Sequence, residues 1–409
     1  MTALRPPGRW AVALAGAVSL AVAMGIGRFA FTPLLPMMLH DGVIDLHGAS
    51  WLASANYLGY LAGALLCTFQ PWIWARIPAL PAISAPSLVR GGLVATGLLT
   101  LGMALPFAAS WPLWRAAAGV ASAVVFVYTS GWCLARLAQM NATAVGGAMF
   151  VGPGAGIVVT GALASAMVQW GGHAQTGWLI FGVLAFGLTA LVWHIYRGPA
   201  ATAAASSPAP GHAPSAVSVH GRVEVGCLAL AYGLAGLGYI VTATFLPVIA
   251  RGALPGSPWL DMFWPIFGFG VMLGALLATR LRVTLDMRAL LLGCYLVQAL
   301  GIAIGVWSPS LAGFALGSLL LGIPFTAITF FAMQEVRRLR PALPASFMGL
   351  LTAVWSLGQL AGPPMVALLL HANSSTDAAF TTALEIAASA LLAGALLYLA
   401  MMRRWPLRR

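Results

Sequence analysis

The sequence contains no lysine, and its 409 residues include only eight acidic side chains. Charged residues make up 7% of the chain and hydrophobic residues 61%, with a mean hydropathy of +0.93. This shortage of charge excludes an ordinary soluble globular protein, in which about 25% of residues are charged. All twenty basic residues are arginines, so their positions are more informative than the net charge of +12.

The few cysteines and histidines form no catalytic or metal-binding motif. The four cysteines lie in apolar runs without CxxC spacing, which is typical of small core residues: Cys67, Cys133, Cys227 and Cys294. The seven histidines make no HExxH motif, and the sequence shows no serine or aspartate pattern of an intramembrane protease. We therefore predict that the protein is not an enzyme and binds no metal or cofactor.

Long apolar runs are abundant. A helix needs about 20 apolar residues to cross roughly 30 Å of hydrocarbon, and the runs lack the alternation of β-barrel strands. The sequence predicts an all-α integral membrane protein with twelve transmembrane helices at 11–38, 49–69, 88–109, 113–137, 145–170, 177–196, 223–250, 259–281, 287–307, 311–333, 346–370 and 380–402. The first run is too long for a cleavable signal peptide, so we expect it to stay in the mature protein.

An uncharged stretch rich in proline, alanine and serine divides the chain. The segment GPAATAAASSPAPGHAPSAVSVHG begins at residue 198, and its composition favours a flexible linker over 198–222. We expect six-helix bundles at 1–197 and 223–409. With an even helix count and the N-terminus inside, seventeen of the twenty arginines fall on inner segments, the bias of the positive-inside rule. The basic excess thus predicts cytoplasmic termini and contact with anionic lipid headgroups, without nucleic acid.

The two halves are related by an internal repeat. GIGRFAFTPLLP at 25–36 aligns with GLGYIVTATFLP at 236–247, an offset of 211 residues. The same offset aligns GYLAGALL at 59–66 with GVMLGALL at 270–277, and an offset of 210 pairs Gly152-Pro153 with Gly362-Pro363. Two parallel six-helix halves are the architecture of the major facilitator superfamily, whose substrate site lies between the halves near the bilayer midplane.

Five stretches, which together sample the whole chain, resemble one family of that superfamily. They are GIGRFAFTPLLPMM, WLASANYLGYLAGALL, RAAAGVASAVVFVYTSGW, AYGLAGLGYIVTATFLPVIAR and SLGQLAGPP, and they are similar to the YbfB/YjiJ family. The resemblance implies a transporter of the inner membrane and supplies no substrate.

Two wider superfamily motifs have counterparts here and a third is missing. Arg115-x-x-x-Gly119 resembles the arginine motif of proton-coupled members. Gly358-x-x-x-Gly362-Pro363 resembles the glycine-proline antiporter motif, which normally belongs to the fifth helix, where this chain has the looser GPGAG at 152–156. The acidic loop motif is absent because Cys67 and, in the repeat, Ala278 stand at its aspartate position, which weakens a drug-antiporter assignment.

Arg28 is the most informative side chain. A charge near the centre of a membrane helix costs about 2.5 to 3.5 kcal/mol on insertion scales, so Arg28 must face a cavity or a partner. Its planar guanidinium matches a carboxylate, which favours binding of an anionic substrate group. The structural alternative is hydrogen bonding to carbonyl groups loosened by nearby prolines, or pairing with a distant acid. Thr32 shares the helix face of Arg28 and would extend the polar site.

Further candidates for the substrate site lie on other spans. Asn56 and Tyr60 share one face of the span 49–69, and Asn56 could equally tie helix to helix. Tyr239 stands at the repeat position of Arg28 and is followed by Thr242, so we expect a site charged on one wall and aromatic on the other. The remaining candidates, each individually more typical of packing, are Tyr128, Trp264, Trp355 and Gln359.

Candidates for coupling are few. Glu224, Asp286 and Glu335 lie at inner ends and are expected to pair with Arg222, Arg282, Arg288 and Arg338. Glu385 and Asp261 remain as membrane-adjacent acids, neither of them central. Arg115 could take part in coupling or, beside Trp111 and Trp114, extend to the outer surface. Gly152, Pro153, Gly358, Gly362 and Pro363 would allow close helix packing and bending.

We conclude that the sequence predicts a monomeric secondary transporter of the bacterial inner membrane that moves a small organic solute by alternating access. An organic anion bound at Arg28 is the preferred substrate. Efflux of hydrophobic or cationic compounds is one alternative, and a ligand sensor with a transporter fold is another. Exchange, symport with the anion's own proton and movement down a gradient all stay open.

Overall fold

The computed structural model describes residues 7–77, 83–196, 221–257, 259–280, 286–339 and 344–407. Within these ranges every regular element is helical. The first half contains α1 (Arg9–Leu20), π-helix η1 (Ala21–Ile26), α2 (Phe31–His40), α3 (Leu46–Arg76), α4 (Ala85–Gly102), η2 (Ala108–Ser110), α5 (Trp111–Gln139), η3 (Thr143–Phe150), α6 (Val151–Gln169) and α7 (Ala174–Val192). The second half contains α8 (Arg222–Ala253), η4 (Leu260–Met262), α9 (Phe263–Arg280), α10 (Met287–Trp307), α11 (Leu311–Leu339), α12 (Pro344–Ala372) and α13 (Thr376–Arg404).

Eleven helical segments in the described part of the chain are long and apolar enough to cross a membrane. The chain is therefore a multi-pass membrane protein, as predicted. The expected span 88–109 corresponds to α4, which carries Arg90 near its start and is not among the eleven. The count of twelve crossings stays a prediction. The proposed linker lies outside the described residues except at Gly221 and Arg222.

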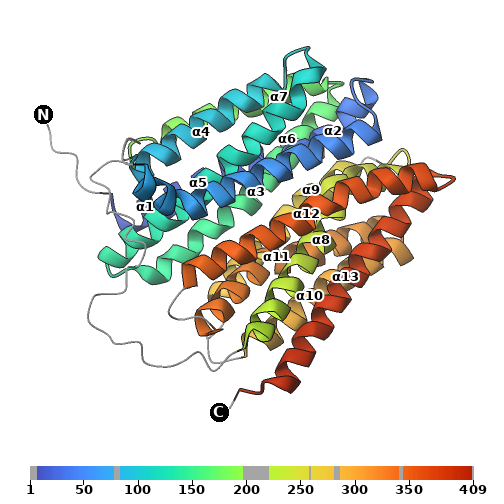
Figure 1. Cartoon of the computed structure of the whole chain (residues 1–409). Helices are drawn as coiled ribbons and strands as arrows, with labels where there is room; N and C mark the ends of the chain where they lie inside the picture. Colours follow the sequence, from blue (N-terminus) through green and yellow to red (C-terminus); the bar gives the residue numbers. More distant parts are fainter. Residues whose placement is uncertain are drawn as a thin grey trace, which may run out of the picture.

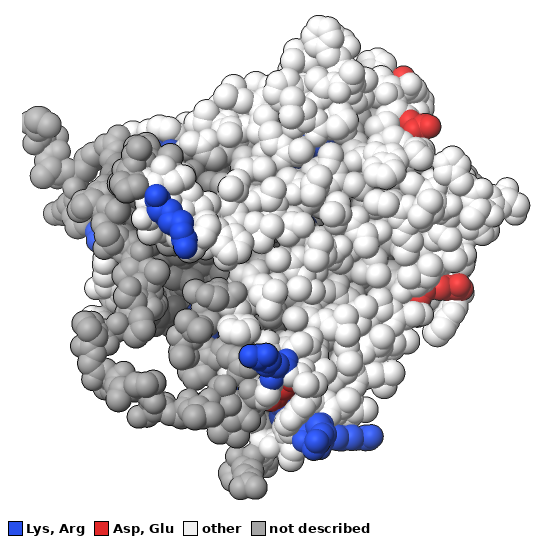
Figure 2. Space-filling model, viewed as in Figure 1, with Lys and Arg blue, Asp and Glu red and all other residues white. Residues whose placement is uncertain are grey.

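The helices of each half lie together, and the start of α1 and the end of α13 lie toward the same end of the molecule (Figure 1). Packing between the halves involves α2 with α8, α3 with α12, and α6 with α9, and also the short helices η3 (with α9) and η4 (with α6). On the face shown in Figure 2, basic atoms lie mostly toward the end of the molecule that carries the chain termini, and acidic atoms mostly toward the opposite end. This asymmetry agrees with the predicted orientation of the arginines.

A break in the first membrane segment separates α1 from α2. Gly25 and Gly27 weaken the helix here, and Pro33 lacks a backbone N–H. The backbone here forms i→i−5 hydrogen bonds, from Gly27 N to Val22 O and from Phe29 N to Met24 O, both 2.9 Å. Such π-helical turns occur often at functional sites. The break leaves carbonyl groups that need donors from other helices because no water is available in hydrocarbon.

Asp41 lies in the loop that follows α2. Its carboxylate accepts a hydrogen bond from the backbone N–H of Ala174 at 2.7 Å, at the start of α7, and lies 3.0 Å from Nδ1 of His173. Burial alone would raise the pKa of Asp41, but these hydrogen bonds and the neighbouring histidines outweigh it and hold the pKa below the ordinary value of 3.8. Asp41 therefore anchors the loop after α2 to the N-terminus of α7.

We expect Asp41→Asn to lower the free energy of unfolding by about 1 kcal/mol at pH 7, the usual value of a helix cap. Because the pKa is depressed in the folded state, the contribution is complete above the unfolded pKa and disappears as the pH falls through the folded pKa. Thermal denaturation from pH 7 to pH 3 should therefore show the two proteins converging at low pH. Glu385→Gln, which changes an exposed acid on α13, is the control. A difference independent of pH would contradict the electrostatic explanation.

Candidate functional site

The break in the first membrane segment places Arg28 at the boundary between the two halves. The Arg28 side chain is only 3% exposed. It donates a hydrogen bond to Oε1 of Gln359 on α12, and a second, at 3.4 Å, to the hydroxyl of Tyr239 on α8. The Gln359 amide nitrogen also donates to the Tyr239 hydroxyl, at 2.5 Å. Arg28, Gln359 and Tyr239 thus form a closed polar triad that links the halves.

Aromatic rings surround the guanidinium on the side of the first half. The Arg28 Cζ atom lies 4.2 Å from the ring centroid of Tyr60 and 5.5 Å from that of Tyr57, both on α3. The ring of Phe29 is 5.2 Å away. Cation–π contacts of this kind help to hold a charge that has left water. Tyr57 was not identified from the sequence, although its spacing from Tyr60 places both on one helix face.

A second aromatic group lies beyond the triad in the other half. Tyr239 stacks on Trp355 of α12 at 5.2 Å, and Trp355 lies 4.6 Å from the ring of Tyr232. The ring of Phe325 on α11 packs against Tyr239 at 4.9 Å and approaches Phe29 at 6.1 Å. Rings therefore flank Arg28 on both sides, which corrects the expectation of one charged wall and one aromatic wall.

Neutral groups alone compensate the charge of Arg28. Among the described residues, neither Arg28 nor Arg115 forms an ion pair with an aspartate or glutamate. Arg28 is a buried cation whose partners are an amide, a hydroxyl and aromatic faces, and its Nε atom has no hydrogen-bond partner. A buried charge without a counter-ion is costly, and an arriving anion would provide that counter-ion.

Arg115 stabilises the break from α5. The side chain is 2% exposed and donates to the carbonyl oxygen atoms of Gly27 at 3.3 Å and Arg28 at 3.2 Å. Ser122, about two turns further along α5, donates to the carbonyl of Ala23 at 2.7 Å. These donors satisfy acceptors that the π-helix leaves unpaired. Arg115 therefore holds the backbone of Arg28 in place.

Two additional hydrogen bonds join the halves near the triad. The Thr32 hydroxyl donates to the carbonyl of Ala243 at 2.7 Å, and the Tyr57 hydroxyl lies 2.8 Å from the hydroxyl of Thr244. Arg28 with Tyr239 and Thr32 with Ala243 are both separated by 211 residues, the offset of the repeat. Equivalent positions of the two halves therefore meet at the centre of the interface.

The family model of MFS transporters described as uncharacterised MFS-type transporter YbfB matches residues 20–399. The chain belongs to this family. The family identification confirms the resemblance seen in the sequence. No curated protein matches the chain.

Solved structures show the same fold. A point mutant of the nucleoside transporter NupG has a TM-score of 0.72 and 15% identity, covering 95% of this chain and 99% of the other. Another NupG structure has a TM-score of 0.68 and 14% identity, covering 97% and 99%. At these identities the likeness concerns the fold alone, and the substrate of NupG is not transferred to this member of the YbfB-type MFS family.

Several predicted site residues of this MFS protein lie close to Arg28. Tyr60, Tyr239 and Gln359 contact it, and Trp355 stacks behind Tyr239. Trp264 lies 6.0 Å from the ring of Phe29. Asn56 is fully buried and donates to the carbonyl of Arg115 at 2.9 Å, so it ties α3 to α5, which was the alternative interpretation of this residue.

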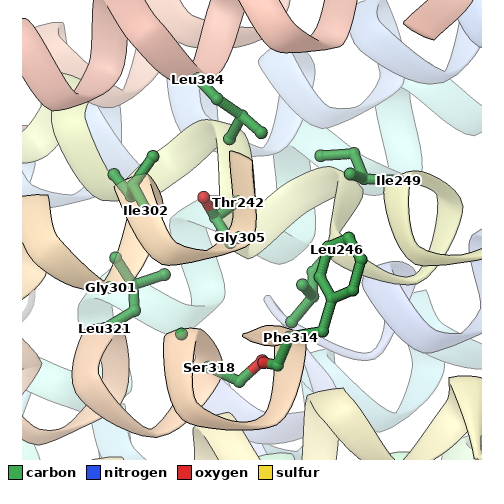
Figure 3. Close-up of a pocket in the computed structure, with 11 residues that line it drawn as sticks. Thr242, Leu246, Ile249, Gly301, Ile302, Gly305, Phe314, Ser318, Leu321 and Leu384 are labelled. Carbon is green, nitrogen blue, oxygen red and sulfur yellow. The ribbon is translucent and has the colours of Figure 1, made fainter. Parts of the chain in front are cut away.

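Other predicted residues lie elsewhere. The Thr242 hydroxyl faces a hollow within the second half, lined by Leu246, Ile302 and Leu384 among others (Figure 3). The space open to the centre of a water-sized sphere there is about 20 Å³, enough for roughly one water. Thr242 therefore does not line a substrate-sized cavity. Tyr128 is half-buried on α5, and among the described residues no hydrogen bond or ring contact joins it to the triad.

Two of the three coupling candidates lie apart from Arg28, and the third, Arg115, contacts its backbone. Glu385 is exposed on α13, and Asp261 pairs with Arg251 near the C-terminal end of α8. Arg115 is buried at the break, so the idea that it extends to the outer surface is wrong. Its carbonyl partners explain the difference because they satisfy the guanidinium within the membrane.

The glycine-proline motifs pack helices closely, but they are not equivalent in space. A Cβ atom at Gly152 would lie 2.0 Å from the carbonyl oxygen of Ala17, whereas one at Gly362 would meet Ile240. By the repeat offset of 211, Ile240 is equivalent to position 29 in the first half. Position 29 is twelve residues beyond Ala17, the residue that Gly152 contacts. Twelve helical residues span about 18 Å, so pairing the motifs at an offset of 210 is wrong. A Cβ atom at Gly358 would approach Gly233 of α8, and one at Gly156 would approach Ala21 and Gly25 of the first segment. Gly358 is therefore the spatial counterpart of Gly156.

Proposed function

We propose that this MFS protein is a secondary transporter that moves a small organic anion across the bacterial inner membrane by alternating access, with both termini in the cytoplasm. The observation that carries the proposal is the buried Arg28 guanidinium, which sits between the halves and has only neutral partners. Charged side chains inside membrane segments are rare and usually serve substrate binding, ion transfer or gating. The planar fork suits a carboxylate, a sulfonate or a phosphate.

The interface chemistry also supports alternating access. We propose that residues 1–197 and 223–409 move as two six-helix units, joined through 198–222, with the protein acting as a monomer. The triad of Arg28, Gln359 and Tyr239 and the bond from Thr32 to Ala243 join the units, and each must break when the units move apart. A substrate anion bound to Arg28 replaces the lost partners, which couples binding to the motion.

Transport of an anion fits the distribution of acids. Within the described residues, the buried acids Glu224 and Glu335 sit with Arg288 and Arg338 at the inner ends of α8, α10 and α11, far along the chain from Arg28. In the part of the chain that the structure describes, no acid contacts the triad to carry a proton there. We therefore propose that coupling, where it occurs, uses the anion itself, through its own proton or through exchange for another anion.

Arg28→Gln tests the proposal. We expect organic acids to raise the denaturation temperature of the purified wild-type protein, and the substitution to weaken the apparent affinity about 10- to 100-fold, because a hydrogen bond to a charged group contributes roughly 1.5 to 3 kcal/mol. The probes are benzoate, succinate, glutamate and tetraphenylphosphonium. Arg222→Gln, at an exposed position on α8, is the control for a lost positive charge.

One pattern of ligand responses would overturn the proposed anion transport. If no acid stabilises the wild type while tetraphenylphosphonium stabilises wild type and Arg28→Gln alike, Arg28 is structural and efflux of cationic compounds replaces the anion model. Uptake into proteoliposomes separates transport from sensing, since a sensor binds the acid and leaves its concentration inside the vesicle unchanged.

A further inference from the structure

Gln359 occupies the position that a substrate carboxylate would need. Its side chain is fully buried on α12, and its amide oxygen accepts from the same guanidinium nitrogen of Arg28 that reaches Tyr239. A primary amide and a carboxylate have the same planar shape, with two polar atoms on one carbon. One carboxylate oxygen can replace Oε1 of Gln359, and the other can accept from the Tyr239 hydroxyl after that hydroxyl rotates.

The charges around the triad set the charge of the ligand. Arg28 provides one positive charge, and Arg115 is already engaged with the carbonyls of Gly27 and Arg28. A ligand with one negative charge therefore neutralises Arg28, while the charge of Arg115 stays with the backbone carbonyls. The second carboxylate of a dianion would lie away from Arg28, among the aromatic rings around the triad, which is unfavourable in a buried site.

The rings around the triad set the shape of the ligand. The guanidinium lies over the Tyr60 ring at 4.2 Å, and in the other half the rings of Tyr239 and Trp355 stack on each other with centroids 5.2 Å apart. An aromatic acid can place its carboxylate on Arg28 and its ring against these aromatic side chains, because aromatic pairs are favourable at centroid separations of about 4.5 to 7 Å. A saturated ring of the same size is thicker and lacks the ring quadrupole.

We propose that the substrate is an aromatic monocarboxylate, and that its carboxylate displaces the Gln359 amide from Arg28. This inference rests on the proposed anion transport and specifies its substrate class. Gln359 thereby acts as an internal stand-in that keeps Arg28 partnered when no substrate is bound. The hydrogen bond from Arg28 to Gln359 also explains how a permanent cation can remain buried when no substrate is bound.

A matched set of ligands tests the substrate class on the purified full-length wild type. We expect benzoate and phenylacetate to raise the denaturation temperature, with cyclohexanecarboxylate about threefold to tenfold weaker because it lacks aromatic stacking. Terephthalate, a dianion, and benzamide, which is neutral, should have no effect. Equal responses to benzoate and cyclohexanecarboxylate, or a response to terephthalate, would overturn the assignment.

Two substitutions at Gln359 distinguish a stand-in from a substrate contact. Gln359→Glu keeps the shape and places a permanent carboxylate on Arg28, so we expect it to abolish benzoate binding in a folded protein. Gln359→Ala removes the competitor, so we expect tighter benzoate binding than in the wild type. Weaker binding in both variants would show that Gln359 contacts the substrate directly and would refute the stand-in. The wild-type ligand series remains decisive if Gln359→Ala fails to fold.

The outcomes also separate this inference from the proposed function. Stabilisation by succinate or glutamate that depends on Arg28, without a response to benzoate, would retain anion transport and refute the aromatic class. If no acid raises the denaturation temperature of the wild type, and Arg28→Gln leaves the response to every probe unchanged, both the proposed anion transport and the aromatic substrate class are refuted.

Discussion

Replacing Arg288 by methionine should lower the free energy of unfolding by about 3 to 5 kcal/mol, the range observed when one partner of a buried ion pair is removed. Arg288 stands at the start of α10 with no exposed surface. Its guanidinium lies 3.6 Å from Glu224 and 3.8 Å from Glu335, both of them buried, and 2.9 Å from Asp286. It also donates to the carbonyl of Trp405 at 2.8 Å.

The cost arises because the groups left behind are buried. Without Arg288, the carboxylates of Glu224 and Glu335 keep Arg338, whose side chain is 25% exposed, as their shared cation. Two buried negative charges then face one positive charge, and the carbonyls of Met401 and Trp405 lose a donor. Unlike a surface ion pair, such a network is poorly screened by water or salt.

Denaturation of the purified protein by heat and by denaturant measures this effect. Arg404→Met, at an exposed arginine on α13, is the matched control and should change stability by less than about 0.5 kcal/mol. The double variant Arg288→Met with Glu224→Gln should recover part of the loss because it removes one of the unpaired charges. Equal losses for Arg288→Met and Arg404→Met would show that the network contributes nothing specific.

The sequence predicted this network in part because short-range charge patterning is visible along the chain. Glu224, Asp286 and Glu335 were expected to pair at inner ends, and the structure confirms Arg288 and Arg338 as partners. Arg222 is exposed, and Arg282 lies outside the described residues. Which arginine lies closest to which acid depends on how four helices pack, and no local pattern encodes that arrangement.

The helical membrane fold was predictable for a simpler physical reason. In hydrocarbon every backbone polar group must be satisfied within its own segment, so hydropathy and length almost determine the helices. The position of Arg28 opposite Tyr239 also followed from the repeat, because symmetry relates the positions that meet at the interface. The π-helical break did not follow, since glycines and prolines indicate a weak helix without specifying its geometry.

The long-range contacts of the site were beyond sequence reasoning. Gln359 was one of several candidates, and nothing in the sequence showed that its amide would meet Arg28 across 331 residues. Arg115 was expected at the outer surface or in coupling, but its partners are backbone carbonyls whose availability depends on the break in another helix. The partners of Gln359 and Arg115 could not be predicted for the same reason. Buried polar side chains bond to groups that tertiary packing brings near, and the sequence does not specify that packing.

Adding a single methyl group at Gly59 or Gly274 should lower the free energy of unfolding by about 3 kcal/mol, at the upper end of the effects of overpacking. A Cβ atom at Gly59 would lie 1.9 Å from the carbonyl oxygen of Ala116, and one at Gly274 would lie 1.7 Å from that of Ile323. In both cases the obstacle is backbone, which cannot turn aside as a flexible side chain can. Gly59→Ala must therefore separate α3 from α5, and Gly274→Ala must separate α9 from α11.

Glycines without neighbours provide the controls for this prediction. Gly131 on α5 and Gly293 on α10 have no atom within 4 Å of a Cβ placed on them. Because alanine is the better helix former by about 1 kcal/mol, Gly131→Ala and Gly293→Ala should be neutral or stabilising. Since Gly59 and Gly274 lie in different halves, the double variant should lose the sum of the single effects. If the four single variants denature at the same temperature, the close helix contacts within each half are wrong, and with them the packing that holds Tyr60 of α3 against Arg28.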